Sequence, residues 1–208
     1  MHPRIKEAMS LLDAPRELFY SDRPDAQLLW IRCCRLRGAG VPRMVAAQIV
    51  ANSDTDGRDL KWDTKSMRRL QDARADEKPL IGVLGAIGTG KTIAVCTLLD
   101  PEDIYVSATD VARLSDHYSD DRKRLDQLSR VKVLAVDELG QEEDRDRKRI
   151  EVFIHRRIEE GLVTFAIGNM APDEFRECYG DRLMRRAKDY GALVVMNEPL
   201  SSGGKGLA

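Results

Sequence analysis

The sequence has no long apolar run and no targeting segment. None of its 208 residues lies in a stretch long and apolar enough to cross a membrane. The opening residues, MHPRIKEAMSLL, lack the apolar core and the cleavage site of a signal peptide. We therefore expect a cytoplasmic protein with no membrane partner. Hydrophobic residues make up 42% of the chain and charged residues 33%, which is typical of a globular protein that builds its own core.

Cysteine is scarce and has no ligand spacing. Cys33, Cys34, Cys96 and Cys178 form no CxxC pair and no Cys/His pattern typical of zinc. Neither a zinc site nor a disulfide framework is expected in such a chain. Cys96 lies in an apolar helical run, so we expect it to pack as a small hydrophobic residue.

The chain also lacks an excess of charge of either sign. Its net charge of −1 gives no overall basic field that would attract nucleic acid. Basic residues are nonetheless clustered at 145–149, 155–157 and 185–188. Each cluster could form a local basic patch or a solvated helix face.

Composition divides the chain near residue 78. Residues 1–78 have apolar residues at helical spacing and little that predicts a strand, so we expect a small helical region that binds a partner. Within this region, Thr64 is a suitable N-cap for a helix over 64–73. Residues 79–198 alternate strand and helix patterns, and the serine- and glycine-rich residues 199–208 predict a flexible tail.

Five short apolar runs, separated by helical patterns, predict the fold. In chain order they are PLIGVLG, IYVSA, VKVLAV, VTFAIG and ALVVM. Unbroken apolar runs are typical of strands that are buried on both faces of a parallel sheet. The pattern therefore predicts an α/β fold of three layers, in which helices cover both faces of a five-stranded parallel sheet.

A phosphate-binding loop lies between the first of these strands and a helix. The stretch GAIGTGKT matches the pattern G-x-x-x-x-G-K-[ST] at every fixed position. Its glycines allow backbone N–H groups to surround a phosphate, and the start of the helix adds positive potential there. We expect Lys91 to contact the β- and γ-phosphates and Thr92 to hold Mg²⁺. The predicted nucleotide-binding residues are Gly85, Ala86, Ile87, Gly88, Thr89, Gly90, Lys91 and Thr92.

An acidic pair follows the third apolar run. VKVLAVDELG places Asp137 and Glu138 at the carboxyl end of a buried strand, where ligands of parallel sheets bind. We expect Asp137 to hold Mg²⁺, directly or through water. Glu138 is placed to polarise a water for attack on the γ-phosphate. Together with the phosphate loop, this pair favours hydrolysis of the nucleotide over its storage.

A polar strand end and a set of arginines complete the candidate site. Asn169 follows the strand VTFAIG and could hydrogen-bond the attacking water or the γ-phosphate, or could cap the next turn. In GDRLMRRAKDYG, Arg182 and Arg186 lie on one face of a short helix, with Arg185 near them. An exposed arginine there could reach the nucleotide of an adjacent subunit, or the three could form a solvated basic face.

Taken in order, GAIGTGKT, IYVSATDVARL, VKVLAVDELG, VTFAIGNM and GDRLMRR resemble the motifs of AAA+ ATPases of the DnaC/IstB type, the bacterial and phage helicase loaders and transposition helpers. The resemblance spans about residues 80–197. It implies the AAA+ type of P-loop fold, ATP and Mg²⁺ as cofactors, and a homo-oligomer whose subunits share ATP. It also implies that Asn169 is the first sensor residue. Arg186 best matches the arginine finger, with Arg182 as the earlier arginine of the pattern and Arg185 as the alternative finger.

The resemblance implies a function in DNA replication. The leading hypothesis is a Mg²⁺-dependent ATPase that loads a replicative helicase, with single-stranded DNA as a further partner. The close alternative is an IstB-like helper that recruits a transposase on duplex DNA. A small-molecule P-loop kinase would instead need an arginine-bearing lid after the third strand, and a binding module that does not hydrolyse ATP would not need the acidic pair.

Overall fold

The structure is a computed structural model that describes residues 1–22, 25–52, 64–115 and 121–197. The tail predicted over 199–208 lies outside the described residues. The strands are β1 (Leu80–Leu84), β2 (Ile104–Ser107), β3 (Val133–Leu139), β4 (Val163–Gly168) and β5 (Ala192–Val195). The helices are α1 (Pro3–Asp13), α2 (Pro15–Phe19), α3 (Ala26–Gly38), α4 (Arg43–Ala51), α5 (Lys65–Ala75), α6 (Lys91–Cys96), α7 (Ala108–Leu114), α8 (Arg122–Arg130), α9 (Asp144–Glu159) and α10 (Pro172–Asp189). Within the described ranges, no helix combines the length and the apolar character that a membrane span requires.

The five strands form one parallel sheet in the order β2-β3-β4-β1-β5. This confirms the predicted five-stranded parallel sheet. β4 is inserted between β1 and β3, although it follows both of them in the chain. Because all strands run the same way, the loops that follow β1, β3 and β4 leave from the same edge of the sheet.

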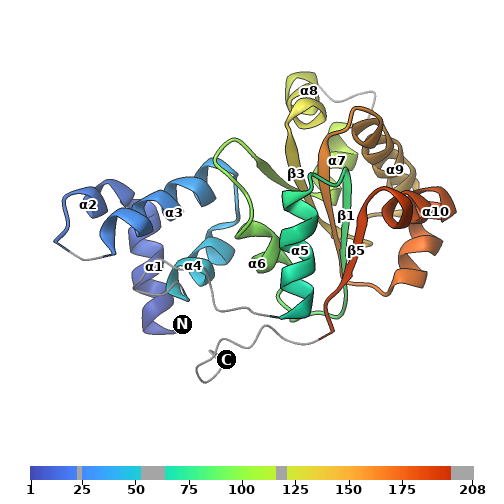
Figure 1. Ribbon diagram of the computed structural model, residues 1–208. Helices are drawn as coiled ribbons and strands as arrows, with labels where there is room; N and C mark the ends of the chain where they lie inside the picture. Colours follow the sequence, from blue (N-terminus) through green and yellow to red (C-terminus); the bar gives the residue numbers. More distant parts are fainter. Residues whose placement is uncertain (23–24, 53–63, 116–120, 198–208) are drawn as a thin grey trace.

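Helices cover both faces of the sheet (Figure 1). α5 and α6 pack on the face that carries Val83 and Phe165, and Cys96 of α6 is buried there as a small hydrophobic residue, as expected. α7, α9 and α10 pack on the opposite face, which carries Leu84 and Val136. Consecutive residues of each central strand are buried on alternate faces, which explains why the predicted strands are apolar throughout. The predicted three-layer arrangement is confirmed.

Helices α1–α4 extend this core beyond α6. Their buried residues, including Leu12, Cys33 and Ile49, belong to one continuous apolar cluster with α5, α6 and one face of the sheet. α4 packs directly against α6 (Figure 1). As predicted, Thr64 caps α5, where its hydroxyl accepts a hydrogen bond from the Met67 N–H at 3.1 Å. The domain boundary near residue 78 stays a prediction. Helix α5, which precedes this boundary in the chain, packs against β1 and β5 of the sheet.

Two helices differ from the expectation drawn from the sequence. α8 was not predicted, because Leu125 and Leu128, which lie on one face, are its only apolar residues among polar and charged ones. The short helix predicted over residues 180–191 is joined end to end to the helical residues that precede it, and the two together form α10. Gly180, with a φ of +83°, marks the bend between them, because this backbone conformation is open to glycine and strained for other residues.

Candidate functional site

The loop between β1 and α6 has the backbone conformation of a phosphate cradle. Gly85 and Gly88 have φ values of +145° and +83°, which residues with a side chain rarely adopt. A Cβ at Gly85 would also collide with the backbone carbonyl of Met196, which follows β5. The Gly85 N–H is bonded to the Met170 carbonyl oxygen at 3.1 Å, so the segments after β4 and β5 both support the loop. Its shape therefore depends on glycine and on the two neighbouring strands.

The Lys91 ammonium lies inside this loop. The Lys91 side chain is buried, and its Nζ donates hydrogen bonds to the carbonyl oxygens of Gly85 at 3.0 Å and Ala86 at 2.6 Å. It also lies 3.3 Å from the Thr89 hydroxyl. Burial lowers the pKa of Lys91, while the nearby Asp137 carboxylate opposes that shift. The loop thus holds its own cation at its centre, where phosphate oxygens could replace the two carbonyls as acceptors.

Asp137 of β3 lies beside the first turn of α6. Its Oδ2 accepts a hydrogen bond from the Thr92 hydroxyl at 2.7 Å and another from the Tyr105 hydroxyl at 2.8 Å. Its Oδ1 accepts one from the Glu138 N–H at 2.7 Å. A hydroxyl oxygen and a carboxylate, held together at a phosphate loop, are the ligands that Mg²⁺ takes alongside phosphate oxygens. The donor set therefore fits the predicted ion.

Glu138 is the exposed member of the acidic pair. It adopts a φ of +63°, which is uncommon for a residue with a side chain and costs about 1–3 kcal/mol. Its side chain faces an open cleft of about 470 Å³, which Tyr105, Ser107, Arg113 and Arg124 also line. The two carboxylates therefore differ in environment: Asp137 is buried and hydrogen-bonded, whereas Glu138 is open to solvent.

The loop after Glu138 is anchored to α10. The Gly140 N–H lies 2.9 Å from both the Glu142 carboxylate and the Tyr179 hydroxyl. Tyr179 in turn donates a hydrogen bond to Glu142, and both side chains are buried. The sequence gives no signal for this cluster, because its members come from two segments with unremarkable local patterns. Tyr105 was missed for the same reason, since it lies on β2 and reaches a carboxylate of β3.

Asn169 comes directly after β4 and is exposed. Since β4 lies between β1 and β3, Asn169 lies at the sheet edge between the phosphate loop and the acidic pair. The next residue, Met170, supports the phosphate loop through its bond to Gly85. The structure thus brings Asn169 to the same edge as Lys91 and Asp137.

The candidate arginines have a different position. Arg182 and Arg186 follow the bend in α10, and both contact the Glu159 carboxylate of α9, at 3.7 Å and 3.2 Å. Arg185, the alternative, is exposed on the same helix. The sequence had placed all three on one short helix, and the structure assigns two of them a common carboxylate partner within the subunit.

Solved structures share the fold of this chain. DnaI has a TM-score of 0.55 at 20% identity, and the match covers 77% of this chain and 93% of DnaI. A candidate primosome component of Streptococcus pyogenes serotype M3 has a TM-score of 0.56 at 15% identity, with coverage of 78% and 93%. The chain has the AAA+ fold. In this fold β4 lies between β1 and β3. The phosphate loop after β1, the acidic pair at the end of β3 and Asn169 after β4 therefore lie at one edge of the sheet.

The AAA+ fold is also seen in the replication initiator DnaA. In the structure of DnaA bound to AMPPCP and single-stranded DNA, the match has a TM-score of 0.50 at 18% identity. It covers 65% of this chain and 47% of that one, so the chain spans about half of DnaA. Comparison of the sequence with protein-family models returns no match, and comparison with curated proteins returns none either.

Proposed function

We propose that this chain is a Mg²⁺-dependent ATPase that acts in DNA replication as a helicase loader. The observation that carries the ATPase assignment is the hydrogen bond from Thr92 to Asp137, which joins the phosphate loop to the acidic strand end at one sheet edge. An exposed carboxylate, Glu138, lies next to that junction. The groups proposed to bind phosphate, to bind the ion and to activate water therefore lie next to one another.

Each residue has a distinct task in the proposed reaction. The backbone of Gly85–Gly90 and the Lys91 ammonium hold the β- and γ-phosphates of ATP. Thr92 and Asp137 hold Mg²⁺, which supplies charge neutralisation at the phosphate oxygens when bound. Glu138 accepts a proton from the attacking water as it adds to the γ-phosphorus, and ADP leaves. Asn169 orients that water or the γ-phosphate through its amide.

We also propose that the active form is a homo-oligomer. Arg186 would leave Glu159 and stabilise the charge that develops on the γ-phosphate of a neighbouring subunit, with Arg182 supporting it. Arg185 is the alternative for this role. Hydrolysis would then require contact between subunits, as the resemblance to helicase loaders implies.

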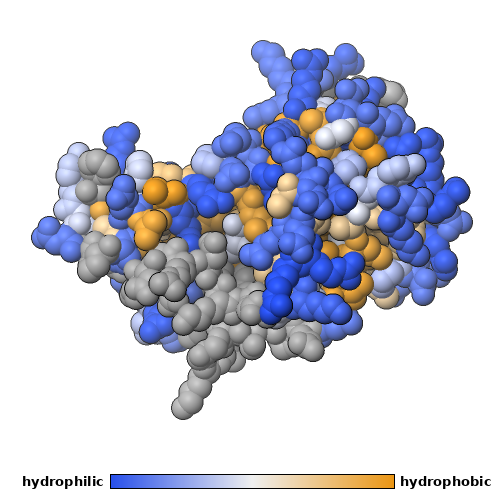
Figure 2. Space-filling model, in the orientation of Figure 1, coloured by the Kyte–Doolittle hydropathy of each residue, from blue (hydrophilic) through white to orange (hydrophobic). Residues whose placement is uncertain are grey.

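The N-terminal helices are the proposed partner-binding region. Leu28 and Ile31, one turn apart on α3, are 47% and 41% exposed, and Met44 of α4 is 46% exposed. Figure 2 shows apolar surface over these helices. Exposed apolar side chains that cluster on one surface are typical of protein interfaces. We infer that this surface binds a replicative helicase, while the AAA+ core contacts single-stranded DNA.

Replacement of Glu138 tests the ATPase assignment. Glu138→Gln should bind ATP with the affinity of the wild type, because no phosphate contact is lost. Hydrolysis should fall by about 10²- to 10⁴-fold, since the amide cannot accept the proton from water. Measurement of phosphate release, together with binding of a fluorescent ATP analogue, separates these effects. Normal turnover in this variant would reject Glu138 as the base, and lack of ATP hydrolysis by the wild type would reject the proposed function.

The partner is tested with the full chain. Binding assays in the presence of ATP should retain a purified replicative helicase and not a transposase. Leu28→Asp should abolish retention while leaving ATP hydrolysis unchanged, because Leu28 lies on α3 and is exposed. Retention of a transposase in place of the helicase would assign the chain to transposition.

A further inference from the structure

Tyr105 makes contacts in two opposite directions. It lies on β2, an edge strand whose only neighbour among the described strands is β3. On the open side of the strand, the Tyr105 N–H donates a hydrogen bond to the Ala39 carbonyl oxygen at 2.7 Å. On the other side, its hydroxyl donates to Oδ2 of Asp137 at 2.8 Å. One residue therefore links the turn between α3 and α4 to the carboxylate proposed to hold Mg²⁺.

The turn between α3 and α4 fits closely against the AAA+ core. A Cβ at Gly38 would lie 2.8 Å from the Pro101 carbonyl oxygen, so only glycine allows this approach. Gly40, with a φ of +74°, follows directly, and a Cβ there would lie 3.7 Å from the Tyr105 carbonyl oxygen. Because the Tyr105 N–H is bonded directly to Ala39 in this turn, a displacement of β2 would be transmitted to the turn.

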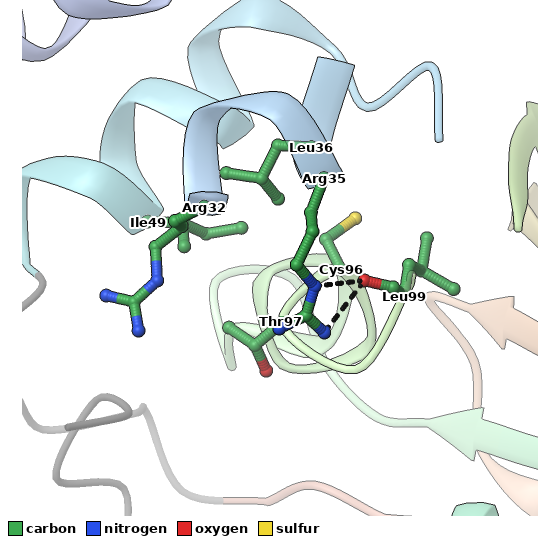
Figure 3. A pocket seen from close by; sticks show the side chains of 7 residues that line it. All are labelled: Arg32, Arg35, Leu36, Ile49, Cys96, Thr97 and Leu99. Atoms are coloured by element: carbon green, nitrogen blue, oxygen red, sulfur yellow. Dashed lines mark hydrogen bonds between the residues drawn. The ribbon is translucent and has the colours of Figure 1, made fainter. Parts of the chain in front are cut away.

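A second attachment joins α3 to the far end of α6. The Arg35 guanidinium donates two hydrogen bonds to the Leu99 carbonyl oxygen, at 3.3 Å and 3.1 Å (Figure 3). It also pairs with Asp100 at 3.0 Å. α6 begins at Lys91 and Thr92, so α3 holds the chain just beyond the helix that carries the phosphate-binding lysine. The N-terminal helices thus contact α6, which carries Thr92, and β2, whose Tyr105 is bonded to Asp137.

The Tyr105 hydroxyl restricts the orientation of Asp137. A carboxylate oxygen has two lone pairs, and on Oδ2 the hydroxyls of Thr92 and Tyr105 take both. Burial and the Asp137 charge raise the pKa of Tyr105, so its hydroxyl stays protonated and remains a donor. Oδ1 keeps one position beyond its bond to the Glu138 N–H, and this position is left for an ion or for its water.

We propose that Tyr105 is a positioning residue, which orients the Mg²⁺-binding carboxylate and transmits its state to the turn between α3 and α4. This inference rests on the proposed function. It assigns to the edge strand β2 a route by which nucleotide binding can change the partner-binding helices. The route has three steps. Asp137 is hydrogen-bonded to the Tyr105 hydroxyl, the Tyr105 side chain is covalently attached to its own backbone, and the Tyr105 N–H is hydrogen-bonded to the Ala39 carbonyl oxygen.

Replacement of Tyr105 by Phe tests the first step. Tyr105→Phe keeps the ring and the backbone bond to Ala39, and it removes the donor to Asp137. We expect the Mg²⁺ concentration for half-maximal hydrolysis to rise by about tenfold, as is usual when a partner of a metal ligand is lost. Affinity for an ATP analogue in EDTA should be unchanged, because the phosphate loop is intact. Tyr190→Phe, at a tyrosine that is 68% exposed, is the matched control and should behave as the wild type.

Hydrogen exchange tests the transmission and needs no activity. In the wild type, Mg²⁺ with ATP should slow exchange at the Tyr105 amide and in the turn at residues 38–42. In Tyr105→Phe, the change in the turn should disappear. Exchange in the turn that does not respond to Mg²⁺ and ATP in the wild type would overturn the inference, even if the variant failed to fold.

The outcomes separate the inference from the proposed function. If the wild type hydrolyses ATP and Tyr105→Phe has the same Mg²⁺ dependence, the inference fails and the ATPase assignment stands. If the wild type neither binds nor hydrolyses ATP with Mg²⁺, both fail. Three results for Tyr105→Phe together support both the inference and the proposed function. The Mg²⁺ concentration for half-maximal hydrolysis is raised, affinity for the ATP analogue in EDTA is unchanged, and hydrogen exchange in the turn no longer responds to Mg²⁺ and ATP.

Discussion

His155 is buried on α9 between charged groups of two helices. Burial is the main cause that lowers its pKa below the ordinary value of 6.5, and the positive charges of Arg186 and Arg182 lower it further. The Glu151 carboxylate, 3.5 Å from Nε2, and Glu159 oppose the shift. The neutral imidazole is thus the form that the folded protein favours.

The position of His155 predicts a loss of stability in mild acid. As the pH falls below about 6.5, the unfolded chain takes up a proton at this residue before the folded one does, so the free energy of unfolding decreases. The decrease ends once the pH is below the pKa of the folded state. Thermal unfolding between about pH 7.5 and about pH 5.5 should therefore show a larger drop in Tm for the wild type than for His155→Phe.

An exposed histidine provides the control for this measurement. His2, at the start of α1, is exposed, and His2→Asn keeps an acceptor for the Arg4 N–H. This variant controls for the removal of an imidazole as such. Equal pH dependence of the wild type and His155→Phe would mean that protonation of His155 does not contribute to acid instability.

At the scale of helices and strands, one buried guanidinium holds several elements together. Arg157 of α9 is 0% exposed, and it donates hydrogen bonds to the Leu128 and Val131 carbonyls at the end of α8, at 2.6 Å and 3.0 Å. It also bonds to the Val163 carbonyl at 2.8 Å and to the Thr164 hydroxyl at 2.9 Å. Burial lowers its pKa to about 10, so the guanidinium stays charged.

Loss of this guanidinium should be costly. Arg157→Met removes the donors and leaves the Leu128, Val131 and Val163 carbonyls without them, so we expect a loss of about 3–5 kcal/mol in the free energy of unfolding. Urea unfolding measures this loss. Arg156→Met, at the exposed neighbouring position, is the matched control and should change stability by less than about 0.5 kcal/mol. A loss below about 1 kcal/mol for Arg157→Met would show that water satisfies the carbonyls instead.

The elements that the sequence predicts are those with a strong local signal. The five strands coincide with the predominantly apolar runs of the sequence, and the Thr64 cap has a side chain suited to one position. The sequence predicts the phosphate loop and the acidic pair because the chemistry of phosphate and Mg²⁺ requires particular residue types in each motif. By contrast, Arg157 was read only as part of a basic cluster, because its carbonyl partners lie on other elements. The strand order likewise depends on packing between distant segments, which a local pattern does not encode.

At the scale of the whole molecule, the proposed oligomer would divide the site between subunits. The phosphate loop and acidic pair lie at one sheet edge, whereas Arg182 and Arg186 are bonded to Glu159 on α9. The Arg186 side chain is 22% exposed, so its proposed action on a neighbour requires release from Glu159. Assembly should therefore expose a cation that the single subunit keeps paired.

Mixing of two inactive variants tests this division. Arg186→Ala should lose turnover by about 10³-fold in assembled protein, because the charge on the γ-phosphate lacks its stabilising cation. Glu138→Gln is inactive for a different reason, and it still carries Arg186. Mixed oligomers should therefore regain hydrolysis at sites that combine Glu138 of one variant with Arg186 of the other, which a phosphate-release assay would detect.

A third variant, at Arg185, decides between the candidate arginines. Arg185→Ala should retain turnover if Arg186 is the finger. Failure of mixing to restore activity, while sizing shows that the two variants assemble together, would contradict action between subunits. It would then leave Arg186 with a role inside its own subunit, through Glu159.

A ribosome synthesises β1 before either of its partners in the sheet. Both β4 and β5 pair with β1, and both come later in the chain than the acidic pair at the end of β3. A nascent chain that ends before Val163 therefore carries the complete phosphate-loop sequence on an apolar strand with two open edges. Such a strand is prone to pair with other chains until its neighbours arrive. The loop is thus the first motif of the site to be translated and among the last to acquire its shape.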